Sequence, residues 1–206
     1  MRSLIENQIK SSIEAKQKLL GDDNFIESIQ NIVNIVIKAY RSGNKVLICG
    51  NGGSAADSQH IAAEFVSKFK MDRNALPAIA LTVNTSVLTS IGNDYDYKNI
   101  FERQVEAFGK EGDVIIGIST SGNSPNISLA LKKAKALGMI TIGFLGRDGG
   151  DNKNYCDVPM VVPSEDTPRI QEAHIMIGHI MCELVEKELF EGNTENLLKR
   201  DYLRIS

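Results

Sequence analysis

The stretch from Asp113 to Pro125 reads DVIIGISTSGNSP, a short apolar run followed by a loop of hydroxyl-bearing residues and a proline. A second stretch, KVLICGNGGS at residues 45–54, repeats this order with a glycine-rich loop. Neither apolar run alternates with polar residues, which is typical of strands buried on both faces of a parallel sheet. Each stretch therefore predicts a strand that passes through a loop into a helix, the unit from which α/β folds are built.

Three further apolar runs complete a predicted sheet of five strands, at residues 78–82, 140–145 and 158–162. Segments with helical periodicity fall between the runs, at 54–69, at 84–108 with a break near Asn93, and at 124–137. A final helix over 167–191 is apolar nearly all round, so it is expected to be buried, with another subunit as one possible cover. The alternation of strand and helix predicts a doubly wound α/β fold with a mainly parallel five-stranded sheet.

Two amphipathic helices precede the first strand, over residues 3–20 and 24–42. Turn residues follow each of them, at 21–23 and 43–44. The helices predict either an oligomerisation element or a cover for the chain's own sheet, and the sequence leaves both open. The chain is thus divided into a helical segment at 1–43, an α/β domain at 44–191 and a polar tail at 192–206.

Composition restricts the classes of partner. The 206 residues include 23 Lys and Arg against 26 Asp and Glu, a formal net charge of −3. This balance argues against a dedicated nucleic-acid binder or a binder of anionic membranes, and it leaves room for a small anionic ligand. The three cysteines form no zinc-type pair and are typical of reduced core residues. No signal-peptide pattern and no apolar run of ~18 residues is present, so a cytoplasmic protein is expected.

The loops after the first and third strands are the predicted ligand site, because open α/β sheets bind ligands beyond the carboxyl ends of their strands. Glycines and a helix N-terminus suit a phosphate group. Neither loop matches the P-loop or the G-x-G-x-x-G pattern. The second loop carries four hydroxyls, and its last serine precedes a proline as a helix N-cap precedes N1. These hydroxyls belong to Ser119, Thr120, Ser121 and Ser124. Phosphate binding at 119–124 is predicted, with a well-capped turn as the alternative.

Polar side chains on two helices are candidates for chemistry. His60 and Glu64 are four residues apart, share one helix face and suit a metal, an acid–base pair or a plain surface ion pair. On the final helix, Gln171, His174 and His179 interrupt an apolar surface, where polar groups need partners. Gln171 and His179 lie ~12 Å apart along a helix axis, near the limit for meeting one ion. A bend in the helix or a neighbouring chain is therefore expected to complete such a site.

Together these motifs resemble the sugar isomerase (SIS) family and, within it, the phosphoheptose isomerases. The resemblance covers about residues 5–190. The segments that carry it are CGNGGSAADSQHIAAEF at 49–65, IGNDYDYKNIF at 91–101, GDVIIGISTSGNSPNI at 112–127, GRDGG at 146–150 and RIQEAHIMIGHIMCELVE at 169–186. The tail after about residue 191 lies outside the resemblance.

The resemblance implies a ketose–aldose isomerase that converts sedoheptulose 7-phosphate to D-glycero-D-manno-heptose 7-phosphate, a precursor for lipopolysaccharide, capsule or S-layer glycans. It implies a homotetramer with active sites at subunit contacts. It also implies one Zn²⁺ per subunit, with Glu64 as the base and His179 as the acid. The implied zinc ligands are His60, Glu64, Gln171 and His179. The implied substrate contacts are Asn51, Gly52, Gly53, Glu64, Asn93, Asp94, Ser119, Thr120, Ser121, Ser124 and Gln171.

Three alternatives share the fold. The first is a non-catalytic SIS protein that binds the replication initiator, although such a module needs neither Glu64 nor His179. The second is an isomerase or etherase for another sugar phosphate, because the phosphate loop does not discriminate sugar length. The third is a phosphosugar-sensing regulatory domain, for which the expected DNA-binding extension is missing.

Overall fold

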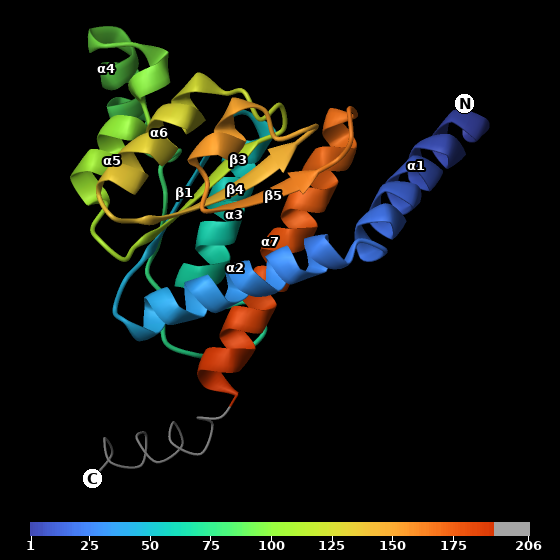
Figure 1. Cartoon of the computed structure of the whole chain (residues 1–206), viewed down its shortest axis with the longest axis horizontal. Coiled ribbons are helices and arrows are strands. Elements are labelled where there is room, and N and C mark those ends of the chain that lie inside the picture. The colour runs from blue at the N-terminus through green and yellow to red at the C-terminus, as the bar shows by residue number, and fades with distance from the viewer. Residues whose placement is uncertain (192–206) are drawn as a thin grey trace.

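Five parallel strands form the centre of the molecule, in the order β2-β1-β3-β4-β5. This computed structural model describes residues 1–191 (Figure 1). The doubly wound five-stranded parallel sheet is confirmed. The strands are β1 (Val46–Gly50), β2 (Ala78–Ala80), β3 (Val114–Ser119), β4 (Ile140–Gly146) and β5 (Val158–Val162).

Seven α-helices and two 3₁₀ helices surround the sheet within residues 1–191. The helix predicted over 84–108 is three separate elements, and the one predicted over 54–69 ends at Val66. It ends early because the backbone N–H groups of residues 69–71 bond to a carboxylate of the last helix instead. The helices are α1 (Arg2–Leu20), α2 (Asp23–Arg41), α3 (Gly53–Val66), α4 (Thr85–Asp94), η1 (Tyr97–Asn99), α5 (Glu102–Phe108), α6 (Pro125–Ala136), η2 (Asp151–Tyr155) and α7 (Thr167–Phe190).

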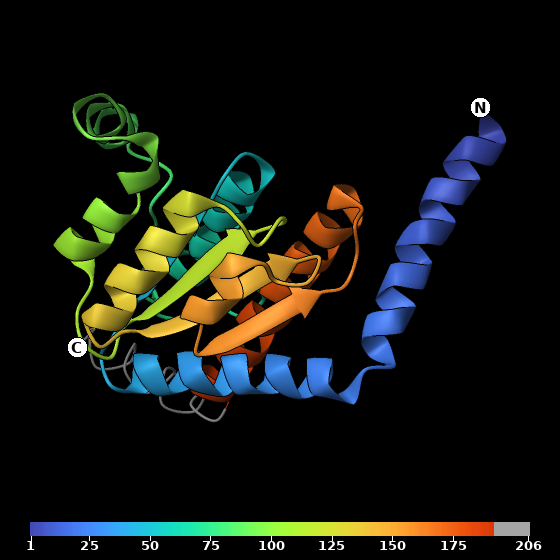
Figure 2. The ribbon, with the colours of Figure 1, turned by 45° about the horizontal axis from the view of Figure 1, so that its top comes forward.

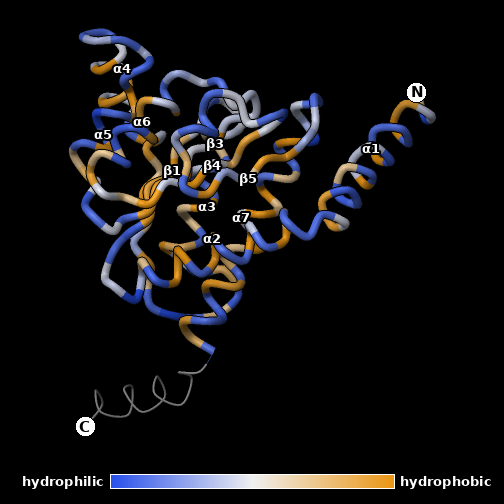
Figure 3. The backbone as a smooth tube through the Cα atoms, in the orientation of Figure 1, coloured by the Kyte–Doolittle hydropathy of each residue, from blue (hydrophilic) through white to orange (hydrophobic). Residues whose placement is uncertain are grey.

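Each face of the sheet is covered by its own layer of helices. Successive residues of a strand point to opposite faces. Val46 and Ile48 therefore face α2, α3 and α7, whereas Leu47 and Cys49 face α5 and α6. The strands run through the centre of Figure 3 as orange segments because both faces are apolar. Each fully buried aliphatic side chain contributes roughly 1.5–3 kcal/mol relative to an exposed one.

The two N-terminal helices behave differently. In α2, Ile32 and Val36 are fully buried, so this helix covers the chain's own sheet beside β5 and α7. Helix α1 projects from the body (Figure 2). Its contacts to α7 include the carbonyl of Gln8, which accepts a bond from Arg169. Four of its apolar side chains, those of Leu4, Ile5, Ile9 and Ile13, are 50–68% exposed.

The final helix is buried along one side, where Ile177, Met181 and Val185 are fully covered, whereas Leu184 on another side is 41% exposed. The three cysteines are free, as predicted, and burial raises the pKa of the Cys49 thiol to about 12. Within residues 1–191, no helix combines the length and the apolar character that crossing a membrane requires. The predicted tail at 192–206 lies outside the described residues.

Candidate active site

The two predicted ligand loops lie side by side, because β1 and β3 are neighbours at the point where the strand order reverses. Gly52, the N-cap of α3, has φ +56°, a conformation that favours glycine. An amide pair joins the first loop to the first turn of α6. Asn51 Nδ2 donates to Asn126 Oδ1 at 2.9 Å, and Asn126 Nδ2 donates back at 2.8 Å. The Tyr97 hydroxyl also donates to Asn51, at 3.2 Å.

The turn after β3 gathers its hydroxyls at the N-terminus of α6. Ser119 Oγ lies 2.9 Å from Ser124 Oγ and 3.4 Å from Ser121 Oγ. Ser124 is the predicted N-cap and Pro125 follows at N1, yet the Ser124 hydroxyl makes no capping bond and faces Ser119 instead. Thr120 lies half-buried in the same turn. Clustered hydroxyls at the positive end of a helix dipole suit an anion.

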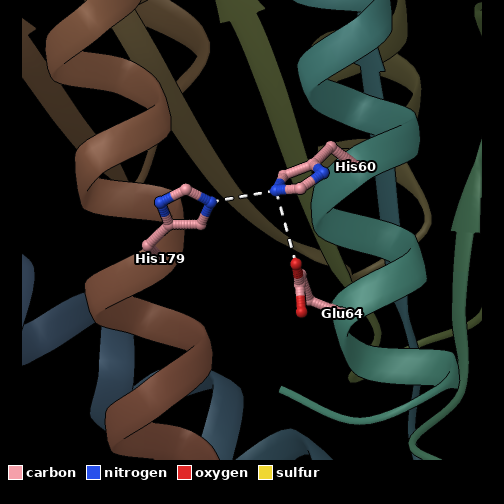
Figure 4. Close-up of side chains that lie close together, drawn as sticks. All are labelled: His60, Glu64 and His179. Atoms are coloured by element: carbon pink, nitrogen blue, oxygen red, sulfur yellow. Dashed lines mark hydrogen bonds and ion pairs between the residues drawn. The ribbon is translucent and has the colours of Figure 1, made fainter. Parts of the chain in front are cut away.

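His60, Glu64 and His179 meet between α3 and α7 (Figure 4). His60 Nε2 is 2.9 Å from His179 Nε2 and 3.3 Å from Glu64 Oε1. Which of the two Nε2 atoms donates depends on the tautomers of the rings. The predicted pairing of His60 with Glu64 on one helix face is present, and the same chain supplies His179.

The three side chains together offer ligand atoms that could hold a metal ion. One potential ligand atom from each lies within 4.8 Å of the others. Two imidazoles and a carboxylate are typical zinc ligands, with bonds of about 2.0–2.2 Å that put neighbouring donors a little over 3 Å apart. The observed separations of His60 Nε2 from Glu64 and His179 are close to that spacing.

Gln171 lies two helical turns from His179. The α3 and α7 helices run in the same direction, so that Gln171 is beside Gly53 while His179 is beside His60. A Cβ at Gly53 would overlap the Gln171 amide. Helix α7 is uninterrupted from Thr167 to Phe190.

Three other predicted polar residues lie apart from this cluster. Asn93 and Asp94 end α4, are exposed and bond to each other at 2.8 Å. No hydrogen bond or ion pair within residues 1–191 links these two to the remaining predicted site residues. His174 is fully buried, faces the Leu145 carbonyl at 3.2 Å, and its burial lowers its pKa to about 4.

Sequence reasoning missed several neighbours of the site. Asp57 precedes His60 by one helical turn; burial raises its pKa, although His60 and His179 act in the opposite direction. The helical spacing from His60 was a signal for it. The Phe69 ring lies 5.8 Å from that of His179, and Asn126 bonds to Asn51. No local pattern marks either contact.

Comparison with known proteins identifies the family of this chain. The model of the SIS domain matches residues 12–146. A phosphoheptose isomerase from Clostridium acetobutylicum is 80% identical over 190 residues, which cover 92% of this chain and 97% of that protein. This chain belongs to the SIS domain family, among the phosphoheptose isomerases.

Solved members of the family have the same fold. The phosphoheptose isomerase GmhA from Neisseria gonorrhoeae is 41% identical, with a TM-score of 0.85 over 90% of this chain and 98% of that one. A phosphoheptose isomerase from Francisella tularensis is 36% identical, with a TM-score of 0.86 over 91% of this chain and 100% of that one. The family predicted from the sequence motifs is confirmed.

Proposed function

We propose that this chain interconverts sedoheptulose 7-phosphate and D-glycero-D-manno-heptose 7-phosphate. Such a ketose–aldose isomerisation is the first step toward ADP- or GDP-heptose for lipopolysaccharide, capsule or S-layer glycans. The family's named activity supports it. The observation that carries the proposal is the convergence of His60, Glu64 and His179. A base, an acid and a cation-binding group are what proton transfer beside a carbonyl needs.

The substrate's phosphate is proposed to bind the turn at 119–124, where clustered hydroxyls and the N-terminus of α6 favour an anion. His60 is seven residues beyond Gly53, about 10 Å of helix. The carbonyl end of the sugar is proposed to lie further along α3, on the side of His60 and His179. The remaining proposed contacts are Thr120, Asn51, Gly52, Gly53, Asn93, Asp94 and Gln171.

Zinc is the proposed ion, one per subunit, held by His60, Glu64 and His179, with Gln171 as a fourth ligand. Two imidazoles and a carboxylate at the observed separations fit Zn²⁺. When bound, the ion supplies Lewis-acid stabilisation of negative charge on sugar oxygens. Gln171 must extend along α7 from its place beside Gly53 to join the other three.

The proton transfers are assigned to Glu64 and His179. The Glu64 carboxylate removes a proton from C1, and the electron pair forms the C1–C2 double bond while His179 protonates the C2 oxygen. The product is an enediol. Glu64 then returns its proton to C2 as the O1 proton goes back to His179, which leaves the aldehyde at C1. A cation-bound carboxylate is a weaker base, and an imidazole nitrogen bound to a cation carries no proton, so Glu64 and His179 each hold their two roles at different moments.

The chain is further proposed to form a homotetramer with its active sites at subunit contacts, assembled through the segment 1–43. The exposed apolar side of α1 supports this, because isolated helices gain stability mainly from tertiary or quaternary packing. A cytoplasmic location is proposed because the three cysteines are free.

The decisive assay incubates the purified chain with sedoheptulose 7-phosphate, with and without chelator, and measures the aldose formed. We expect conversion that falls on chelation and returns with zinc. Glu64→Gln should abolish turnover and leave the circular dichroism spectrum unchanged. Near-normal activity in that variant would remove the base assignment. Binding of the replication initiator without conversion, or conversion of a different sugar phosphate only, would favour the alternatives.

A further inference from the structure

A buried ion pair lies beside the site without belonging to it. Arg73, in the connection between α3 and β2, donates from Nε to Glu186 Oε2 of α7 at 2.9 Å. The two side chains are 1% and 2% exposed. Removing two charges from water is costly unless nearly every polar atom is bonded. The partners of both groups therefore indicate what this pair does.

The Glu186 carboxylate is fully engaged with the connection that follows α3. Its Oε1 accepts bonds from the backbone N–H groups of Lys70 at 2.7 Å and Met71 at 2.8 Å. Its Oε2 accepts from the N–H of Phe69 at 2.9 Å. Burial raises the pKa of Glu186, but these bonds and Arg73 outweigh it and hold the pKa below its ordinary value. The carboxylate thus anchors residues 69–71 to α7 as an anion.

The Arg73 guanidinium binds the other side, the last turn of α3. Its Nη2 donates to the Glu64 carbonyl at 2.8 Å, and its Nη1 donates to the Phe65 carbonyl at 2.7 Å. Carbonyls at a helix C-terminus lack partners within the helix, and a cation there complements the dipole. One side chain therefore holds the backbone of Glu64 while it is bonded to α7.

Both ends of the pair reach the catalytic cluster. Arg73 bonds to the backbone of Glu64, whereas Glu186 holds Phe69, whose ring packs 5.8 Å from the His179 ring at an interplanar angle of 33°. We propose that the Arg73–Glu186 ion pair positions Glu64 and His179 relative to each other across the α3–α7 contact. Both members are positioning residues. The inference rests on the proposed function, which assigns proton transfer to Glu64 and His179.

A structural role alone would also use polar bonds, because the N–H groups of residues 69–71 and the last carbonyls of α3 need partners that apolar side chains cannot supply. The guanidinium is planar and its N–H groups point in fixed directions, so its bonds also set the orientation of the groups that accept them. Here the guanidinium donates to two carbonyls of α3 and one carboxylate of α7, and its Nη1 also donates to the carbonyls of Ser67 at 3.3 Å and Asn74 at 3.0 Å. The expected effect of the pair is therefore on the geometry of the site.

The test compares Glu186→Gln with Arg73→Lys, which keeps the cation and loses the fork. Glu183→Gln is the matched control, because Glu183 is on the same helix and its ion pairs with Lys70 and Lys187 are partly exposed. Each full-length variant is loaded with Co²⁺, whose visible absorption reports ligand geometry. Zinc affinity is measured by competition with a chromophoric chelator at a temperature below the unfolding transition of every variant. Steady-state kinetics with the heptose phosphate complete the set.

We expect Glu186→Gln and Arg73→Lys to shift the cobalt spectrum, to weaken zinc binding at least about 10-fold and to lower kcat similarly. KM should change less than about 2-fold, because the proposed phosphate-binding turn follows β3 and is not part of the α3–α7 contact. Glu183→Gln should match the wild type. Folded variants with wild-type cobalt spectra and zinc affinity would overturn the inference, and so would a wild type that takes up no cobalt. If the wild type binds cobalt but converts no heptose phosphate, the proposed function is wrong. The cobalt spectra of the variants then still test whether the ion pair positions the metal ligands.

Discussion

Replacing Gly178 by alanine tests whether close contact between α3 and α7 brings His179 to His60. Gly178 directly precedes His179 and is buried against Ile61, one residue after His60. A Cβ at position 178 would lie 2.7 Å from Ile61 Cδ1 and 2.9 Å from Ile61 Cγ1. Ordinary contact begins at 3.4 Å, so the gap must widen by about 0.7 Å. Ile61 is fully buried and β-branched, which restricts its escape by rotation.

Two effects on stability oppose each other. Replacing a glycine inside a helix by alanine stabilises by about 1 kcal/mol, whereas overpacking a core costs about 1–3 kcal/mol. The free energy of unfolding should therefore fall by up to about 2 kcal/mol. Metal binding should be more sensitive than folding, because metal–ligand distances vary by only about 0.2 Å, less than the displacement expected between α3 and α7. We expect zinc affinity to fall about 10- to 100-fold.

Urea denaturation and chelator competition measure the two effects. Gly92→Ala in α4 is the control for the gain in helix stability, because within residues 1–191 the added Cβ meets no atom within 4 Å apart from its chain neighbours and its own helix backbone; this variant should be more stable than the wild type. Ile61→Ala combined with Gly178→Ala removes the overlapping atoms and should recover zinc affinity, with a coupling energy of at least about 1 kcal/mol. Unchanged zinc affinity in Gly178→Ala, together with a stability gain like that of Gly92→Ala, would refute the reasoning.

Three further outcomes are expected. Ser124→Ala should raise KM about 10-fold but cost less than about 0.5 kcal/mol in urea denaturation, because the hydroxyl bonds to Ser119 instead of capping α6; a loss of about 1 kcal/mol or more would indicate a cap. Buried neutral His174 has a folded pKa of about 4 against 6.5 unfolded, so its contribution is present above pH 6.5 and is lost as pH falls toward 4. Between pH 7.5 and 5 the wild type should therefore lose about 2 kcal/mol more than His174→Phe, and equal losses would contradict the assignment. Ile9→Lys combined with Ile13→Lys should reduce the mass measured by light scattering from that of the proposed tetramer to that of a smaller species, since both side chains are at least 50% exposed on α1; an unchanged mass would place the contact elsewhere.

The local features of this protein were predictable from the sequence because they depend on neighbours along the chain. Uninterrupted apolar runs predicted the five strands, and glycine- or hydroxyl-rich loops at their ends predicted the ligand loops. The four-residue spacing of His60 and Glu64 placed both on one helix face. The extent of α3 and the division of 84–108 were less accurate, since contacts to distant residues decide where those helices end.

Contacts between elements were decided only by the tertiary structure. His60 and His179 are 119 residues apart, Asn51 and Asn126 are 75 apart, and Arg73 and Glu186 are 113 apart. Periodicity shows which face of a helix is apolar, but not which partner covers it or at what height. That choice depends on packing the whole core at once, including the approach of α7 to α3 at Gly178. The sequence determined the fold and the chemical groups at hand, and the packing of the helices decided which groups meet.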